Sequence, residues 1–254
     1  MSRRWGVAAA VVATSMIGSP SSSAQSLETL KIRGRDQALR TYGVRGGDPI
    51  VVSSGDGGWM HLGPRVAEVL AARGFFVVGF DVRAYLTSFT SGKTTLRADD
   101  EPGDYRALAE FAAKGTAKKP ILVGVSEGAG LSVLAATDPQ NIAGVVALGL
   151  PDRNELGWRW KDSLIYVTHS VPNEPTFSTA VIVNKVAPLP LAVIHSTHDE
   201  FVSVADVQRV LLDAQPPSKL WLVSASDHRF SGNAVEFESR LIEAMEWVKK
   251  NAPR

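Results

Sequence analysis

The stretch that decides the fold is PILVGVSEGAG, residues 120–130, in which an apolar run leads directly into the pattern Gly-x-Ser-x-Gly. The apolar residues before Gly124 have the composition of a buried strand, and the small and apolar residues after Gly128 favour a helix. Glycines on both sides of Ser126 let a strand and a helix approach closely enough to be joined by a very sharp turn. The pattern predicts a strained elbow that exposes the hydroxyl of Ser126 above the sheet.

Two other structures share this pattern. One is a glycine-rich turn from strand to helix that carries no chemistry, and the other is a loop that cradles a phosphate. A phosphate loop continues with Lys followed by Ser or Thr, which the sequence lacks after Gly130. We therefore expect Ser126 to be a nucleophile, with the amide of Glu127 and the helix N-terminus directed at the atom that it attacks.

Strand patterns alternate with helix patterns along most of the chain. The expected strands are 27–33, 38–44, 50–52, 75–80, the run before Ser126, 143–150, 191–196 and 220–223. The expected helices are 62–73, 105–113, the one after Ser126, 204–212 and a C-terminal helix, while 82–100 is expected to be a polar loop. This alternation predicts an α/β architecture with a mostly parallel central sheet and helices on both faces. We expect a single domain over residues 25–254.

The alternation of strand and helix patterns stops after the sixth expected strand. Residues 152–188 carry Trp158, Trp160, Tyr166 and Phe177 among prolines and polar residues. This small insertion is expected to lie over the rim of the sheet as a lid or substrate wall. The other interpretation is that its aromatic side chains fill a side core.

The N-terminus has the pattern of an export signal. Arg3 and Arg4 precede an apolar run that Gly18 and Pro20 end, and small residues follow. The run is short for a membrane span, so we expect residues 1–24 to be a cleaved signal peptide rather than an anchor, and the mature protein to be periplasmic or secreted. Removal of residues 1–24 changes the formal net charge of the chain from +1 to −1. A net charge this close to zero indicates no nucleic-acid partner.

A serine nucleophile needs a base, and the base needs a partner that holds its tautomer. Of five histidines, His228 alone follows the last expected strand, where catalytic groups of an open α/β sheet collect. His195 is expected inside its strand, and His61 and His169 at the surface or in the insertion. His228 is therefore the expected base.

Asp199 follows the strand 191–196 and is the expected acid. The order Ser126, Asp199, His228 is the order of the triad in α/β-hydrolases. Asp152, after the preceding strand, is the rival. A metal site built from His195, His198 and Asp199 is not expected, because those side chains diverge at a strand end, and we expect no cofactor.

The oxyanion of an attacked ester needs two backbone donors. The amide of Glu127 is one, and the loop 54–59 after the third strand supplies the other. Asp56 is the first candidate in that loop and Gly57 the second. Trp59, Asp56 and Glu127 are expected to contact the substrate.

The sequence resembles an α/β-hydrolase and, more narrowly, the exported bacterial VirJ family. The resemblance rests on SSGDGGW at 53–59, on RG-x-x-VVG-x-D at 73–81, on the elbow and on HRF at 228–230. It covers about residues 49–250. Family members usually have Tyr-Ser-Phe-Gly at the nucleophile, where this chain has VSEG at 125–128.

This resemblance implies one of two roles: a part in type IV secretion and virulence, with secretion proteins as partners, or hydrolysis of aminoacyl-phosphatidylglycerol at the periplasmic membrane face. Asp56, Glu127, Glu200 and Asp227 adjoin the expected site and would form an acidic rim that attracts ammonium groups, unless they are simply solvated. We therefore expect a serine esterase acting on an ester whose acyl part is cationic. The alternatives are a non-catalytic accessory protein and a general hydrolase of small esters or peptides.

Overall fold

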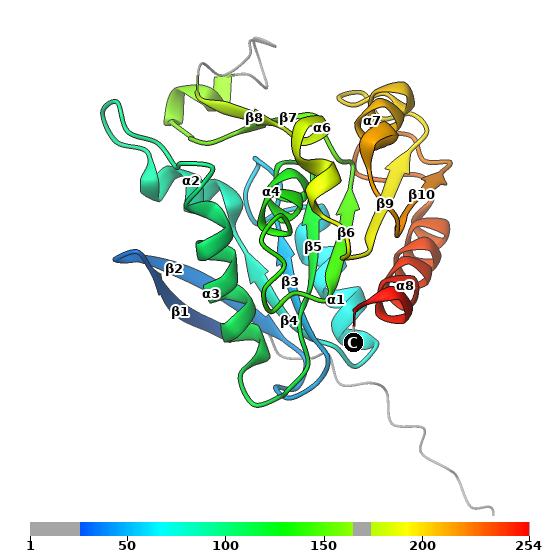
Figure 1. Ribbon diagram of the computed structural model, residues 1–254, viewed down its shortest axis with the longest axis horizontal. Coiled ribbons are helices and arrows are strands. Elements are labelled where there is room, and N and C mark those ends of the chain that lie inside the picture. Colours follow the sequence, from blue (N-terminus) through cyan, green and yellow to red (C-terminus); the bar gives the residue numbers. More distant parts are fainter. Residues whose placement is uncertain (1–25, 165–173, 254) are drawn as a thin grey trace, which may run out of the picture.

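The computed structural model describes residues 26–164 and 174–253 and builds them around an eight-stranded sheet (Figure 1). The strand order is β1-β2-β4-β3-β5-β6-β9-β10. The strands are β1 (Ser26–Ile32), β2 (Arg35–Tyr42), β3 (Pro49–Ser53), β4 (Phe76–Phe80), β5 (Ile121–Val125), β6 (Gly144–Leu148), β9 (Leu191–Ser196) and β10 (Ser218–Val223). β2 runs antiparallel to β1 and β4, and the pairs from β4 to β10 are parallel. All eight expected strands are present within a few residues of their predicted ends.

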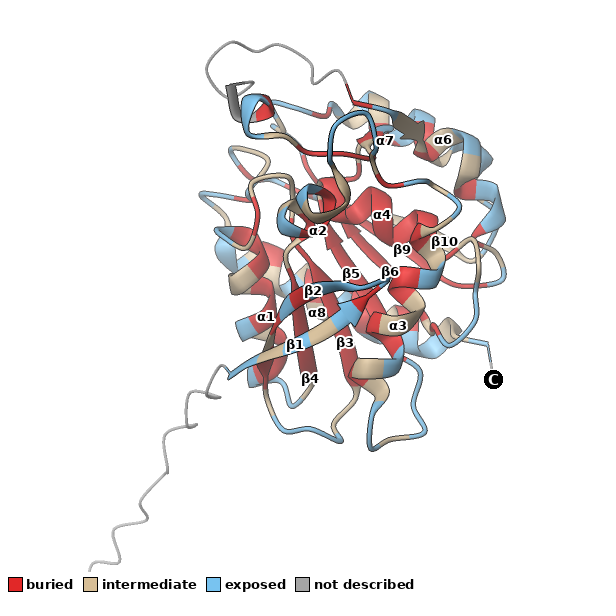
Figure 2. Ribbon diagram, turned by 90° about the vertical axis from the view of Figure 1, so that its left-hand side faces the viewer, coloured by how far each residue is buried: buried red, intermediate tan, exposed pale blue. Residues whose placement is uncertain are grey.

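Helices cover both faces of the sheet. One face packs against α1 (Leu62–Ala72) and α8 (Ala234–Asn251). The other packs against α2 (Val82–Phe89), α3 (Glu101–Ala113), α4 (Glu127–Ala135) and α7 (Val204–Val210). The central strands are buried between these layers (Figure 2), which is why they appear in the sequence as continuous apolar runs rather than alternating ones. The expected architecture is confirmed.

The prediction of a loop over 82–100 is wrong in its first part, because α2 begins directly after β4. The Asp81 side chain accepts a hydrogen bond from the amide of Ala84 at 2.9 Å and so caps the helix. Val82, Tyr85 and Leu86 are fully buried on one side of the helix, and Phe89 packs against the same core. These contacts with the core stabilise a short helix that also carries polar side chains.

The insertion after β6 forms a small two-stranded sheet and several short turns of helix. It contains β7 (Arg153–Glu155), η1 (Trp160–Leu164), β8 (Thr176–Ser178), α6 (Thr179–Ile182) and η2 (Val183–Lys185); a further turn, η3 (Leu211–Asp213), follows α7. Trp158 is buried in the main core and Phe177 packs against it, whereas Trp160 is 83% exposed. Trp158 and Phe177 therefore join the main core rather than a lid or a separate side core. Tyr166 lies outside the described residues.

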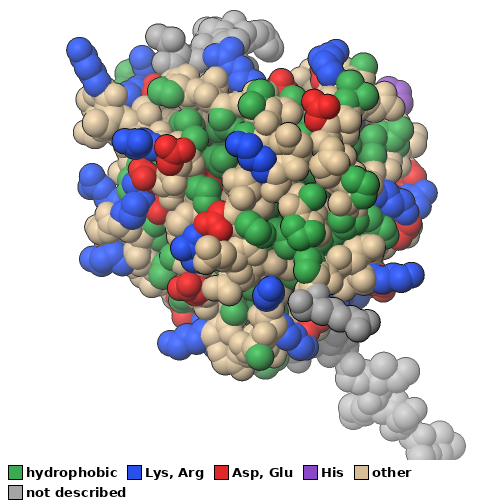
Figure 3. Space-filling model, in the orientation of Figure 1, with side chains coloured by type: hydrophobic (Ala, Val, Ile, Leu, Met, Phe, Trp, Pro, Cys, Tyr) green, Lys and Arg blue, Asp and Glu red, His purple; other side chains and the backbone are tan. Residues whose placement is uncertain are grey.

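The carboxyl ends of the parallel strands meet at one edge of the sheet, and the β7–β8 pair lies beyond that edge (Figure 1). Loops from β3, β5, β6, β9 and β10 converge there, so residues far apart in sequence can share one site. On the face that Figure 3 shows, Lys and Arg side chains are mixed with Asp and Glu. No helix within residues 26–164 and 174–253 is both long and apolar enough to cross a membrane. The expected signal peptide, 1–24, lies outside the described residues.

Candidate active site

Ser126 forms the turn between β5 and α4 with backbone angles φ 51° and ψ −117°. A non-glycine residue adopts this strained conformation only when its surroundings impose it. The Ser126 amide donates to the Leu148 carbonyl at 2.8 Å, which ties the turn to β6. A Cβ atom at Gly124 would lie 2.2 Å from the Gly128 carbonyl oxygen. The strand and helix therefore approach as closely as the sequence pattern requires.

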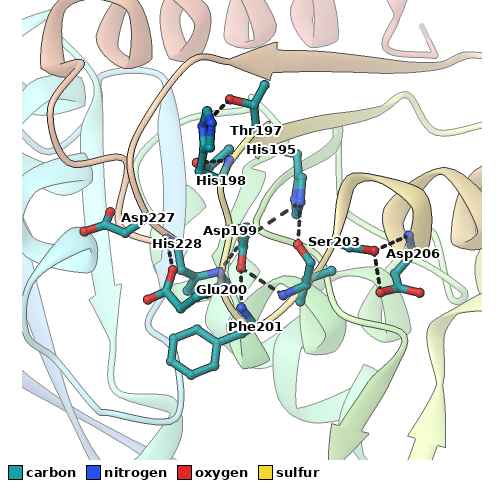
Figure 4. A network of polar contacts seen from close by, with 12 residues as sticks. His195, Thr197, His198, Asp199, Glu200, Phe201, Ser203, Asp206, Asp227 and His228 are labelled. Atoms are coloured by element: carbon teal, nitrogen blue, oxygen red, sulfur yellow. Dashed lines mark hydrogen bonds and ion pairs between the residues drawn. The ribbon is translucent and has the colours of Figure 1, made fainter.

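His228 and Asp199 meet at the same edge. Nδ1 of His228 lies 2.5 Å from Oδ2 of Asp199, whose side chain is fully buried. Asp199 Oδ1 accepts hydrogen bonds from the amides of Phe201 and Val202, each at 2.9 Å (Figure 4). Burial acts to raise the pKa of Asp199, but the contact with His228 and these two amides outweigh it and hold the pKa below its ordinary value. Asp199 is therefore a carboxylate, and it favours a proton on Nδ1 of His228.

Three further contacts fix the His228 ring. Its backbone amide donates to Glu200 Oε2 at 2.7 Å, and the ring meets Phe201 edge to face with centroids 5.5 Å apart. On another side the ring lies over Gly149, where a Cβ atom would be 2.6 Å from Cε1 of His228. The imidazole is thus held between the loops that follow β6 and β9.

His195 supports the turn that presents Asp199. It lies inside β9, as expected, and its side chain is fully buried. Nε2 is 2.9 Å from the Val202 carbonyl oxygen, to which it donates (Figure 4). Burial lowers the pKa of His195 despite the opposing effects of Asp199 and Val202, so the ring is neutral and braces the loop. Sequence reasoning gave His195 no role in the site, because nothing in the sequence shows which loop its ring will reach.

The loop after β3 and the start of α4 both lie beside Ser126. The Gly55 Cα is so close to the elbow that a Cβ atom there would lie 3.3 Å from Cβ of Ser126. The amides of Asp56, Gly57 and Glu127 donate to no acceptor within the described part of the chain. Asp56, Gly57 and Glu127 line the same pocket as Ser126, so their amides stay the candidate donors to an oxyanion.

These groups line a pocket of about 610 Å³. The lining residues are Gly55, Asp56, Gly57, Gly58, Met60, His61, Leu62, Arg83, Val125, Ser126, Glu127, Pro151, Arg153, Glu155, Phe201, Val202, His228 and Arg229. Ser126 and His228 therefore open into one space, and Asp199 lies behind the imidazole. The expected substrate contact Trp59 is not in this lining. Its indole packs over Gly79 and donates to the Tyr42 hydroxyl at 3.3 Å.

The pocket is not the uniformly acidic rim that the sequence suggests. Arg83, Arg153 and Arg229 line it together with three carboxyl groups, those of Asp56, Glu127 and Glu155. The Glu127 side chain is buried rather than solvated, and Asp227 accepts hydrogen bonds from the amides of Arg229 and Ser231 in its own turn. Arg83, Arg153 and Glu155 were missed because they lie on α2 and on β7, where no motif marks them, and Arg229, although it belongs to the HRF motif, was given no role in the pocket.

The rival acid Asp152 is held elsewhere. Its carboxylate accepts hydrogen bonds from the Ser178 hydroxyl at 2.6 Å and from the Ala180 amide at 2.9 Å. These contacts anchor the insertion at the start of α6. His228 has its hydrogen bond with Asp199 instead.

The fold is that of the α/β-hydrolases. The α/β hydrolase GrgF from Penicillium sp. sh18 superposes with a TM-score of 0.66 at 12% identity, over 90% of this chain and 99% of that one. The Pyrococcus furiosus esterase Pf2001 superposes with a TM-score of 0.63 at 19% identity, over 89% of this chain and 91% of that one. XC6422 from Xanthomonas campestris, a serine hydrolase without a lid, superposes with a TM-score of 0.59 at 18% identity, over 91% of this chain and 96% of that one. At these identities the likeness concerns the fold alone.

Within that class, the model of the bacterial virulence protein (VirJ) family matches residues 48–155. The matched region contains the loop 53–59, the strand that ends at Asp81 and the elbow, and it confirms the resemblance over this part of the chain. It ends before Asp199 and His228. No curated protein matches the chain at a significant level.

Proposed function

We propose that this protein is a serine esterase that works through an acyl-enzyme. The observation that carries the proposal is the pairing of the His228 ring with a buried carboxylate, 2.5 Å away, in the pocket into which the strained Ser126 opens. A nucleophile, a base and a group that fixes the tautomer of the base are the parts that acyl transfer requires.

In this mechanism Oγ of Ser126 bonds to the ester carbonyl carbon while its proton passes to Nε2 of His228. The amides of Glu127 and Asp56, with Gly57 as the second choice in the loop, stabilise the oxyanion. Collapse of the tetrahedral anion breaks the bond to the alcohol oxygen, which takes the proton from His228. Water then repeats these steps on the acyl-serine and releases the carboxylic acid.

The preferred substrate is an ester with a cationic acyl part, of the aminoacyl-phospholipid type. The resemblance to VirJ supports this class, and so do the charges of the pocket. Glu127 is buried beside Ser126, whereas Arg153 and Arg229 are exposed, so a substrate carrying both an ammonium and a phosphodiester would find a partner for each. A lipid head group as substrate agrees with the export that the N-terminus indicates.

A non-catalytic accessory role in type IV secretion is the second candidate, and the match to a virulence family favours it. In that case the insertion 152–188 would hold a partner protein, and hydrolysis would be absent. A general hydrolase of small esters is a third reading of the same site.

Labelling with a fluorophosphonate separates an enzyme from an accessory protein. Wild type should be modified covalently at Ser126, and Ser126→Ala should not react. Ser224→Ala, at an exposed serine outside the pocket, is the matched control and should be labelled like wild type. A folded wild type that stays unlabelled would refute the esterase.

A further inference from the structure

The carboxyl group of Glu127 has an unusual environment for an acid next to a nucleophile. The residue is only 3% exposed, yet it lines the pocket. Its Oε1 atom is buried and has no hydrogen-bond partner within the described residues. A buried acceptor without a partner destabilises a protein, so a proton or a ligand at this position is expected.

Glu155 brings a second carboxyl group to the same place. Side chains alternate along a strand, and in β7 the middle residue, Asn154, points into the protein. It is fully buried and donates to Thr179 Oγ1 at 2.8 Å, and it fills the space above Gly130, where a Cβ atom would lie 1.7 Å from its Oδ1. The side chains of Arg153 and Glu155 therefore point the other way and line the pocket.

Glu155 influences the protonation of Glu127. Burial raises the pKa of Glu127 well above its ordinary value, and the contact of its side chain with Glu155 raises it further. Two touching carboxyl groups cannot both be ionised at little cost. The ionisable groups that face Glu127 are Glu155 and Arg153 from β7, Asp56 from the loop after β3, and Tyr105 from α3.

We propose that Glu127 and Glu155 form a subsite that binds a primary ammonium group of the substrate in exchange for their shared proton. The proposal rests on the esterase function and names a recognition group for it. In the free site a carboxylic acid and a carboxylate carry one negative charge. When an R–NH₃⁺ ion enters and the proton leaves to solvent, two carboxylates and one cation carry the same net charge. The buried site thus never holds an uncompensated second charge.

Proton release on binding is the measurable consequence. The probe is the n-butylammonium ion, with n-butanol as the neutral control, titrated calorimetrically into the protein in buffers of different ionisation enthalpy. One proton should be released per ion bound, and the dissociation constant should fall about tenfold per unit of rising pH below the pKa of the pair. n-Butanol should show no such pH dependence.

Glu127→Gln should abolish the proton release, because it removes the carboxyl group whose pKa burial raises, and Glu155→Gln should weaken n-butylammonium binding by about tenfold or more at neutral pH. Glu155→Asp, which keeps the charge, should retain part of that affinity. Glu246→Gln, at an exposed position on α8, is the matched control and should bind like wild type. Binding without proton release, or no binding by a folded wild type, would overturn the proposal. Because calorimetry needs no turnover, this result is independent of whether the protein hydrolyses p-nitrophenyl acetate, which tests the esterase itself.

Discussion

Replacing Asp199 by Asn should abolish most of the hydrolysis without changing the shape of the site. Both backbone donors of the loop, the amides of Phe201 and Val202, bond to Oδ1. The amide oxygen of Asn must stay there, because the opposite orientation would place an NH₂ group against two N–H groups. The NH₂ group then takes the place of Oδ2 and faces Nδ1 of His228, 2.5 Å away in the wild type.

An N–H donor at that place forces Nδ1 to accept, so the His228 proton moves to Nε2. A protonated Nε2 cannot take the proton of Ser126. Loss of the correct tautomer lowers kcat by about 10⁴-fold in other enzymes with this arrangement, which corresponds to about 5.5 kcal/mol in the activation barrier.

The assay is steady-state hydrolysis of p-nitrophenyl acetate, with the melting temperature of each variant as a check of folding. Asp213→Asn, the same change at an exposed position of η3, should leave kcat/KM within about twofold of wild type. A loss of less than about tenfold in a folded Asp199→Asn variant would show that Asp199 does not set the tautomer.

Further predictions concern stability. Burial, with a further contribution from Asp104, raises the pKa of Glu101 well above its ordinary value, and neither carboxyl oxygen has a hydrogen-bond partner within the described residues. Above about pH 4.5 the unfolded chain loses a proton at Glu101 that the folded protein keeps. The free energy of unfolding is therefore highest below that pH, and it falls as the pH rises toward the pKa of Glu101 in the folded protein. Urea denaturation of wild type should show this fall, of up to about 1.4 kcal/mol per pH unit, and Glu101→Gln should remove it. A variant with the same pH dependence as wild type would contradict the prediction. Gly124→Ala should destabilise by about 1–3 kcal/mol, because its Cβ would meet backbone of α4. The control is Gly103→Ala, where no atom lies within 4 Å, and it should be neutral or stabilising by up to about 1 kcal/mol; equal melting temperatures for the two alanine variants would refute the close contact.

The sheet could be predicted from the sequence because its parallel strands are buried on both faces. Each appears as a short apolar run bounded by glycine, proline or polar residues. The helix α2 was missed for the opposite reason. Only three of its eight residues are buried, so its apolar residues are too few to produce a clear helical period.

The site was predictable where a residue follows a strand, and not where it depends on tertiary packing. Ser126, Asp199 and His228 follow β5, β9 and β10, so their positions come from the fold itself, and their catalytic roles stay a prediction until they are tested. Glu155 lies on a strand of three residues whose partner, β8, is about twenty residues away. Neither a period nor a motif marks such a pair, and Arg83 and Arg153 have no sequence signal either.

The contact between Gly149 and the His228 ring has an evolutionary consequence. A single methyl group at position 149 would displace the imidazole while leaving all three reacting side chains in the sequence. A descendant that kept only a binding role could therefore have lost hydrolysis by one codon change that motif inspection overlooks. When relatives are classified as enzymes or accessory proteins, the residue at the position of Gly149 should be compared together with the serine, the aspartate and the histidine.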